Sequence, residues 1–212
     1  MAKTPSNMVS LGTTAPNFKL PDVISQKMVS LEQIKGLNGT LIMFICNHCP
    51  YVKHVNATIV NLANKYKQDG INFIAISSND VENYPEDSPK LMKVNAVENN
   101  YVFPYLYDES QEIAKSYDAA CTPDFYLYDS DLLLVYRGQL DDSRPGNGLS
   151  CDGKDISNAI ECLINEKENS QIQKPSIGCN IKWKWIYSTE INSTSKINVA
   201  SGGITPPAPD FP

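Results

Sequence analysis

Between residues 40 and 77 the chain reads as strand, cysteine-containing turn, helix and strand, and this succession restricts the fold more than any other feature. Residues 40–45, TLIMFI, form a short unbroken apolar run, typical of a strand buried on both faces. From Val52 to Tyr66 apolar residues recur every three or four positions, which predicts an amphipathic helix. Gly70 ends it, and a second apolar run, INFIAIS, fills 71–77. This order predicts two parallel strands joined by a helical crossover.

Further elements are predicted on both sides of this unit. The expected additional elements are a small β-hairpin from runs at 17–20 and 27–31, helices at 90–99, 111–117 and 155–164, a short strand at 103–107, and an antiparallel hairpin from 124–129 and 132–138. We therefore expect one α/β domain over residues 1–183. Residues 184–212, rich in Ser, Thr, Asn, Gly and Pro, are predicted to be a poorly ordered tail.

Composition narrows the class of protein. A chain of 212 residues with a net charge of −6 is long enough for one core, and it lacks the clustered Lys and Arg of a nucleic-acid surface. No apolar run approaches the roughly 20 residues that span a bilayer, and the first residues contain no signal-type apolar run. We expect a cytoplasmic protein without a membrane partner. Its six cysteines are too sparse for a secreted disulfide scaffold, so a close pair favours catalysis or metal binding.

The turn after the first buried strand contains a Cys-x-x-Cys motif, Cys46 to Cys49, followed by Pro50. Proline is favoured at the first position of a helix, which places Cys49 at the N-cap. Free N–H groups and the positive end of the helix dipole lower the pKa of a thiol there. We predict that Cys49 is the activated sulfur and Cys46 its partner. The alternative is that both are small buried apolar residues.

Two histidines accompany the cysteines. His48 lies between the two sulfurs, where it is predicted either to stabilise a thiolate or simply to pack in the turn. His54 falls on the polar side of the predicted helix, where we expect it to be solvated. Together with the cysteines they form four potential metal ligands within nine residues, so a metal-binding module remains an alternative.

These motifs, together with a later Thr-Pro before a β-hairpin, resemble the thioredoxin superfamily. The segments LGTTAPNFKLPD and KMVSLEQIKG resemble the N-terminal extension of its peroxiredoxin and TlpA-like (AhpC/TSA-type) branch, and uncharacterised bacterial thioredoxin family proteins share a CNHCPYVKH-type site. The resemblance implies a thioredoxin-like fold: a central mixed sheet flanked by helices, with an N-terminal hairpin.

In that superfamily a cis-proline loop faces the cysteines and aligns bound substrate. The resemblance assigns this role to Pro123, with Thr122 before it and His48 opposite as substrate-binding residues. Cys121 becomes either an accessory redox residue or a packed neighbour, and we favour packing.

The resemblance also exposes differences. Thioredoxins attack with the first cysteine of the pair, whereas Cys49 occupies that register here. Peroxiredoxins share the Cys-Pro pair but have Thr or Ser where this chain has Cys46. Arg137 resembles the peroxiredoxin arginine, although a surface or salt-bridge role is the simpler interpretation. Asp124 is a candidate for the thioredoxin proton-shuttle carboxylate, with a turn hydrogen bond as the alternative.

We therefore predict a thiol–disulfide oxidoreductase acting through Cys46 and Cys49, with a protein or small-molecule disulfide as substrate, an external reductant and no cofactor. The alternatives are a peroxiredoxin-like peroxidase using Cys49, a metal-binding module and a redox-inert interaction domain. Cys179 would be a distal resolving thiol if the tail folds back, and Cys151 and Cys162 are interpreted as structural. The oligomeric state and the ligand of the charged loop 141–148 stay open.

Overall fold

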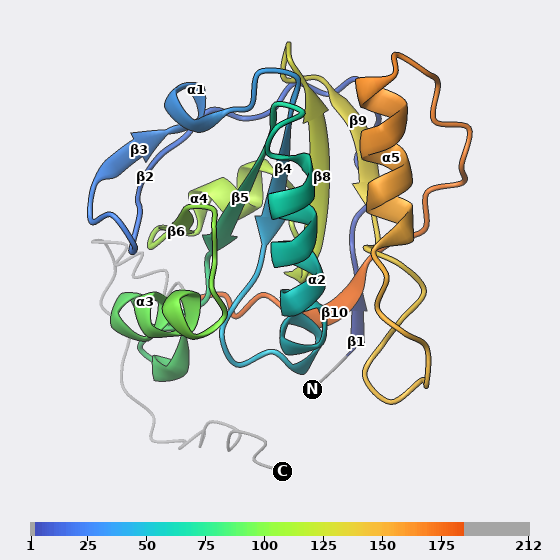
Figure 1. Ribbon diagram of the computed structural model, residues 1–212. Coiled ribbons are helices and arrows are strands. Elements are labelled where there is room, and N and C mark those ends of the chain that lie inside the picture. The colour runs from blue at the N-terminus through green and yellow to red at the C-terminus, as the bar shows by residue number, and fades with distance from the viewer. Residues whose placement is uncertain (1–2, 185–212) are drawn as a thin grey trace, which may run out of the picture.

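The computed structural model describes residues 3–184. Five strands form a central mixed sheet in the order β6-β5-β4-β8-β9, with helices packed against it (Figure 1). The strands of this sheet are β4 (Gly39–Phe44), β5 (Ile71–Ser77), β6 (Tyr105–Tyr107), β8 (Asp124–Asp129) and β9 (Leu134–Gly138). The parallel pairs β4/β5 and β5/β6 form one half, and the antiparallel pairs β4/β8 and β8/β9 form the other. The predicted α/β class and mixed sheet are confirmed.

Alternation along the central strands divides the core into two layers. In β4, Leu41 and Met43 join one buried cluster, while Ile42 and Phe44 join the other. The helices of the first layer are α2 (Pro50–Tyr66), α3 (Pro89–Glu98) and α5 (Lys154–Ile164), and those of the second are α1 (Leu31–Ile34) and α4 (Glu112–Ser116). The helices cover both faces of the sheet, so β4 is buried along its whole length.

Two smaller sheets complete the fold. The predicted N-terminal hairpin is present as the antiparallel pair β2 (Lys19–Pro21) and β3 (Met28–Ser30). A second sheet, not predicted, has the order β1-β10-β7 and joins β1 (Lys3–Pro5), β10 (Ile177–Asn180) and β7 (Cys121–Thr122). This sheet brings both ends of the described chain to the loop before β8.

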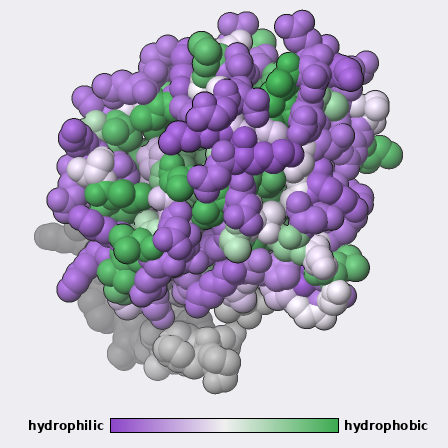
Figure 2. Space-filling view, in the orientation of Figure 1, coloured by the Kyte–Doolittle hydropathy of each residue, from purple (hydrophilic) through white to green (hydrophobic). Residues whose placement is uncertain are grey.

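The surface in Figure 2 is mostly hydrophilic, with small hydrophobic patches scattered among polar residues. Some of them lie over α3, where Val94 and Val97 are exposed. No helix within residues 3–184 has the length and apolar character needed to cross a bilayer. The predicted tail, apart from Lys184, lies outside the described residues.

Candidate functional site

Helix α2 begins at the cysteine motif as the sequence predicts. Pro50 is its first residue and Cys49 is its N-cap, in an extended backbone conformation. Strand β4 ends at Phe44, so Cys46 lies in the short turn between strand and helix. The first turn of α2 presents backbone N–H groups without helical partners near Cys49, and these favour a thiolate over a thiol.

Three sulfurs meet at this helix start. The Sγ of Cys49 lies 2.7 Å from the Sγ of Cys179 on β10 and 3.2 Å from the carbonyl oxygen of Thr122. The Sγ of Cys46 lies 3.4 Å from the hydroxyl of Thr122. All three cysteines, which we call the sulfur cluster, are almost completely buried, with exposed fractions of 1 % or less.

The cluster separates the pKa values of its members. The pKa of Cys49 is lowered, mainly because the Cys179 thiol donates a hydrogen bond to the Cys49 thiolate. A hydrogen bond from the Cys46 thiol and one from the backbone N–H of Val52 lower it further, while burial opposes the lowering. The pKa of Cys46 is raised by its hydrogen bond to Cys49 and by burial, and that of Cys179 is raised for the same two reasons. A single thiolate, on Cys49, is the favoured ionised state.

The loop before β8 faces the cluster. The Thr122–Pro123 peptide bond is cis, as the resemblance implies. Thr122 contacts both cysteines of the motif, its carbonyl lying at Cys49 and its hydroxyl at Cys46. The Cys121 thiol instead donates to the Pro123 carbonyl at 3.6 Å, and burial raises its pKa. This geometry fits a packed neighbour.

His48 points out of the turn toward a buried carboxylate that the sequence did not single out. Its Nδ1 lies 2.7 Å from Oδ2 of Asp87, and its ring stacks on Tyr84 with centroids 5.8 Å apart. The hydrogen bond to Asp87 raises the pKa of His48. Burial raises the pKa of Asp87, but the hydrogen bonds from His48 and Asn79 outweigh this and lower it. A protonated His48 next to Cys49 therefore adds positive charge beside the thiolate.

Asp87, in the short 3-10 helix η1 (Pro85–Asp87), also holds the turn in place. Its Oδ1 accepts hydrogen bonds from the backbone N–H of Asn47 at 2.8 Å and of His48 at 3.3 Å. Asn79 donates to Oδ2 at 2.7 Å, and the Asn79 side-chain oxygen accepts from the backbone of Lys182 at 2.8 Å. Asp87 thus connects the cysteine turn to the residues that follow β10.

Arg137 and Asp124 lie in a separate buried cluster. The guanidinium Nη2 lies 3.3 Å from Oδ2 of Asp124 and 2.9 Å from the hydroxyl of Tyr126, and it also donates to the Asp118 carbonyl. Asp124 belongs to β8 and is fully buried. Strand β8 begins at Asp124 as the sequence predicts, and the turn contact expected as the alternative role is present as a long hydrogen bond of 3.4 Å from the Ala120 N–H. The salt-bridge interpretation of Arg137 is the one that its contacts match.

A set of possible metal ligands differs from the predicted one. Among residues 3–184, ligand atoms of Cys46, His48 and Asp87 lie within 4.8 Å of one another. His54 is not among them, since its Nε2 lies 3.0 Å from the Ser143 hydroxyl. It is half-buried, so the expectation of a solvated His54 holds only in part. Both ring and carboxylate in this set are already engaged in hydrogen bonds with each other.

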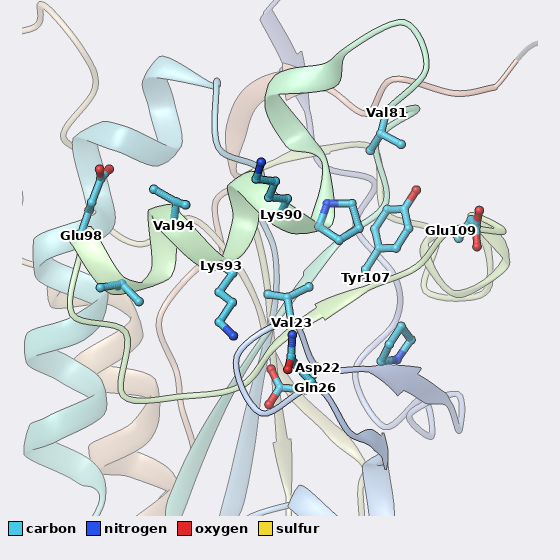
Figure 3. Close-up of a pocket in the computed structure, with 13 residues that line it drawn as sticks. Asp22, Val23, Gln26, Val81, Lys90, Lys93, Val94, Glu98, Tyr107 and Glu109 are labelled. Atoms are coloured by element: carbon cyan, nitrogen blue, oxygen red, sulfur yellow. The ribbon is translucent and has the colours of Figure 1, made fainter.

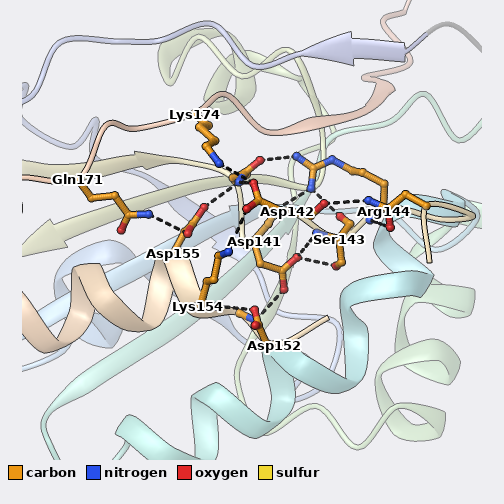
Figure 4. A network of polar contacts seen from close by, with 12 residues as sticks. Asp141, Asp142, Ser143, Arg144, Asp152, Lys154, Asp155, Gln171 and Lys174 are labelled. Carbon is orange, nitrogen blue, oxygen red and sulfur yellow. Dashed lines mark hydrogen bonds and ion pairs between the residues drawn. The ribbon is translucent and has the colours of Figure 1, made fainter. Parts of the chain in front are cut away.

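Figure 4 shows that side chains of the charged loop 141–148 form hydrogen bonds and ion pairs with one another and with neighbouring residues. Asp141 accepts hydrogen bonds from the backbone N–H groups of Ser143 and Gly153. Asp142 forms ion pairs with Lys154 at 3.0 Å and Lys174 at 2.7 Å. These contacts tie the loop to α5 and to the segment that leads into β10, which gives the loop a structural role.

A large groove next to α3 is shown in Figure 3. It has a volume of about 1090 Å³ and lies between α3 and the turn at Asp22–Gln26, with Val23, Val94 and Tyr107 on its walls. None of the residues lining it is a cysteine. The candidate site is the buried sulfur cluster, which contains both cysteines of the motif, and not this groove.

Sequence reasoning missed Asp87 and left Cys179 conditional. Asp87 stands in a polar, proline-punctuated segment 39 positions from His48, and no sequence signal connects the two. Cys179 carried one signal, a cysteine in a segment long enough to fold back, but its partner depends on the pairing of β10 with β7.

Comparison with known proteins identifies the family. The AhpC/TSA family matches residues 11–137 of the sequence. The chain belongs to the AhpC/TSA family. No curated protein gives a significant match.

Several solved structures have a similar fold. An uncharacterized conserved protein from Geobacillus kaustophilus is 58% identical with a TM-score of 0.85, covering 87% of this chain and 97% of that chain. A hypothetical protein from Sinorhizobium meliloti is 42% identical with a TM-score of 0.83, covering 85% and 98%. The thioredoxin domain of a thiol-disulfide oxidoreductase from Bacteroides vulgatus, 19% identical, superposes with a TM-score of 0.59 over 74% of this chain and 100% of that domain. The predicted thioredoxin-like fold is confirmed.

Proposed function

We propose that this AhpC/TSA family member is a thiol–disulfide oxidoreductase in which Cys49 is the attacking thiolate. The observation that supports it most is the position of Cys49 at the N-cap of α2, in contact with a second thiol and with the cis-proline loop. The thiolate attacks a sulfur of the substrate disulfide, a new S–S bond forms, and the other substrate sulfur leaves as a thiolate.

Cys46 is the partner thiol in this proposal. After losing its proton it attacks the Sγ of Cys49, which releases the second substrate thiolate and leaves a Cys46–Cys49 disulfide. Two electrons have then passed from the cysteine pair to the substrate, and an external thiol reductant restores the pair. Thr122 and Pro123 would align the substrate, and His48 would supply positive charge near the Cys49 sulfur. We propose the cytoplasm as the compartment, because six cysteines in 212 residues are too sparse for a secreted disulfide scaffold.

The test is the order of alkylation. Brief exposure of the reduced protein to iodoacetamide at several pH values, followed by peptide mass spectrometry, should modify Cys49 before Cys46 at pH near 6. Both sulfurs are equally buried, so opening of the site affects the alkylation rates of Cys46 and Cys49 alike. The ratio of the two rates therefore reports which sulfur is the thiolate. Earlier modification of Cys46 would sink the assignment.

A peroxidase is the second proposed function, because it is favoured by the match to the AhpC/TSA family. The Cys49 thiolate would attack a peroxide oxygen, forming sulfenic acid and releasing an alcohol or water. In this structure, however, the Arg137 guanidinium is bound to Asp124 and Tyr126, and Cys46 stands where peroxiredoxins have a hydroxyl. Fast, saturable consumption of peroxide, with dimedone trapping sulfenic acid on Cys49, would favour this function over disulfide exchange.

Metal binding by Cys46, His48 and Asp87 is a third proposal, based on the proximity of their ligand atoms. A metal would have to replace the His48 hydrogen bond to Asp87. Protein purified anaerobically and analysed for zinc and copper tests it. Less than stoichiometric metal removes the proposal.

A further inference from the structure

Strand β10, which pairs with β7 beside the cis-proline loop, contributes a thiol to the buried sulfur cluster. The exposed fraction of Cys49 is 0 %, so a disulfide substrate reaches its sulfur only when a covering element moves. Strand β10 lies beside the N-terminal end of α2 (Figure 1), and the Sγ of Cys179 is 2.7 Å from the Sγ of Cys49. The thiol nearest to Cys49 therefore belongs to the strand that pairs with the cis-proline loop.

The register of β10 fixes this placement. Cys179 pairs with Thr122 and Asn180 with Cys121 in an antiparallel ladder, so β10 occupies the backbone edge of the cis-proline loop. At Gly178 an added Cβ would lie 2.0 Å from the Thr122 carbonyl oxygen. The absence of a side chain there lets the strand approach closely enough to bring the Cys179 sulfur to Cys49.

We propose that Cys179 is a second resolving thiol for Cys49, so that the chain forms an internal Cys49–Cys179 disulfide that holds β10 over the site. The proposal rests on the proposed disulfide exchange at Cys49. It assigns Cys179 a catalytic role and leaves Cys121, whose thiol is directed to the Pro123 carbonyl, outside the reaction.

The steps balance without a further co-reactant. A substrate disulfide oxidises Cys49 to a mixed disulfide and releases one thiolate, which takes up a proton. When β10 returns, the Cys179 thiol loses its proton and its sulfur attacks the Sγ of Cys49; the Cys49–substrate bond breaks and the second thiolate leaves. The substrate has gained two electrons, and Cys49 and Cys179 have lost them. Closure of the strand thus accompanies release of product.

The experiment uses the full chain and glutathione disulfide as probe. Wild type, Cys46→Ser, Cys179→Ser and Cys46→Ser/Cys179→Ser are reduced, exposed to the probe, alkylated and mapped by mass spectrometry without reduction. In Cys46→Ser we expect peptides joining Cys49 to Cys179, and at least about tenfold less glutathione on Cys49 than in the double variant, because a neighbouring thiol reacts at a high effective concentration. Equal glutathione on Cys49 in both variants overturns the proposal.

Two further readouts separate the possible failures. Wild-type protein, which depends on no variant folding, should yield some Cys49–Cys179 peptides, and their complete absence overturns the proposal. Circular dichroism checks that each variant is folded, and Cys162→Ser, altered on α5, should map as wild type. If the folded double variant carries no glutathione on Cys49, the proposed function itself fails; if it does while Cys46→Ser carries as much, only the role of Cys179 fails.

Discussion

Two buried polar clusters lie on either side of Pro123, and they differ in what they allow. In the sulfur cluster three groups of one chemical type surround a single favoured thiolate, and their pKa values are driven apart. In the other cluster a cation and a carboxylate, Arg137 and Asp124, are 3.3 Å apart and both fully buried. The sulfurs lie close enough to share a proton, whereas in the ion pair burial raises the pKa of Asp124 to about 7 despite the opposing effect of Arg137. Burial shifts pKa values in both clusters, and the sulfur cluster differs in that its groups are of one kind and share a single favoured thiolate.

The largest effect on activity is expected for a substitution in the sulfur cluster. Replacing Cys49→Ser should lower the rate of reduction of a small aromatic disulfide by at least about a thousandfold, since a serine hydroxyl is not ionised at neutral pH and is a poor nucleophile here. Release of the coloured thiolate measures the rate, with Cys162→Ser as the control. Retention of more than a tenth of the wild-type rate would place the chemistry on another sulfur.

The ion pair should instead be needed for stability. Arg137→Met leaves Asp124 buried without its cation, and we expect a loss of about 3–5 kcal/mol in the free energy of unfolding. Adding Asp124→Leu removes the uncompensated charge and should recover most of that loss. Denaturant titration of both variants measures it. A single variant as stable as wild type would mean that this cluster is not the structural one.

The His48–Asp87 pair is an acid–base pair like Arg137–Asp124, but it lies beside the sulfur cluster. Asp87 connects the cysteine turn to the residues that follow β10. Asp87→Asn should cost about 2 kcal/mol of unfolding free energy near pH 5 and less at pH 8. The pKa of His48 is raised in the folded protein. The stability that protonated His48 contributes is therefore fully present below its usual pKa of 6.5 and is lost as the pH rises through the raised pKa. The pKa of Asp87 is lowered in the folded protein. The stability that ionised Asp87 contributes is therefore fully present above its usual pKa of 3.8 and is lost as the pH falls through the lowered pKa.

The window of greatest effect therefore lies between about pH 4 and pH 6.5. Denaturant titrations at pH 5 and pH 8, with His48→Ala measured alongside, give the two differences. An equal cost of Asp87→Asn at both pH values would show that the ion pair contributes nothing beyond the hydrogen bonds of Asp87 to the turn.

The smallest effect is expected at the exposed loop network. Asp142 pairs with Lys154 and Lys174 at the surface, and water screens such pairs. Asp142→Ala should therefore change the Tm by less than about 2 °C, measured by differential scanning calorimetry. A larger decrease would show that these ion pairs help to hold the segment leading into β10.

Local patterns predicted the scaffold well. The spacing of apolar residues after Pro50 identified α2 and its buried face, and two dense apolar runs identified β4 and β5, because both signals depend only on neighbours in sequence. Strand β10 was not predicted, because its four residues show no periodic pattern of apolar residues. They form a strand only by pairing with β1 and β7.

The site was predictable only in part for the same reason. Cys46, Cys49 and Pro50 are adjacent in the chain, and their position at a helix start follows from local rules. The Asp87 contact to His48 and the complete burial of Arg137 against Asp124 depend on segments that meet only in the folded state. A charged residue is normally exposed, so nothing in the sequence could distinguish Arg137 from a surface arginine.

Strand β1 gives the architecture a practical consequence. Lys3–Pro5 pairs with Ile177–Cys179, so the first residues of the chain support, from outside, the strand that carries Cys179. Any peptide fused ahead of Lys3 is attached to the strand that pairs with β10. Preparations with tags at opposite ends of the chain are thus different reagents for thiol chemistry, and kinetic work on this protein should begin with the tag removed.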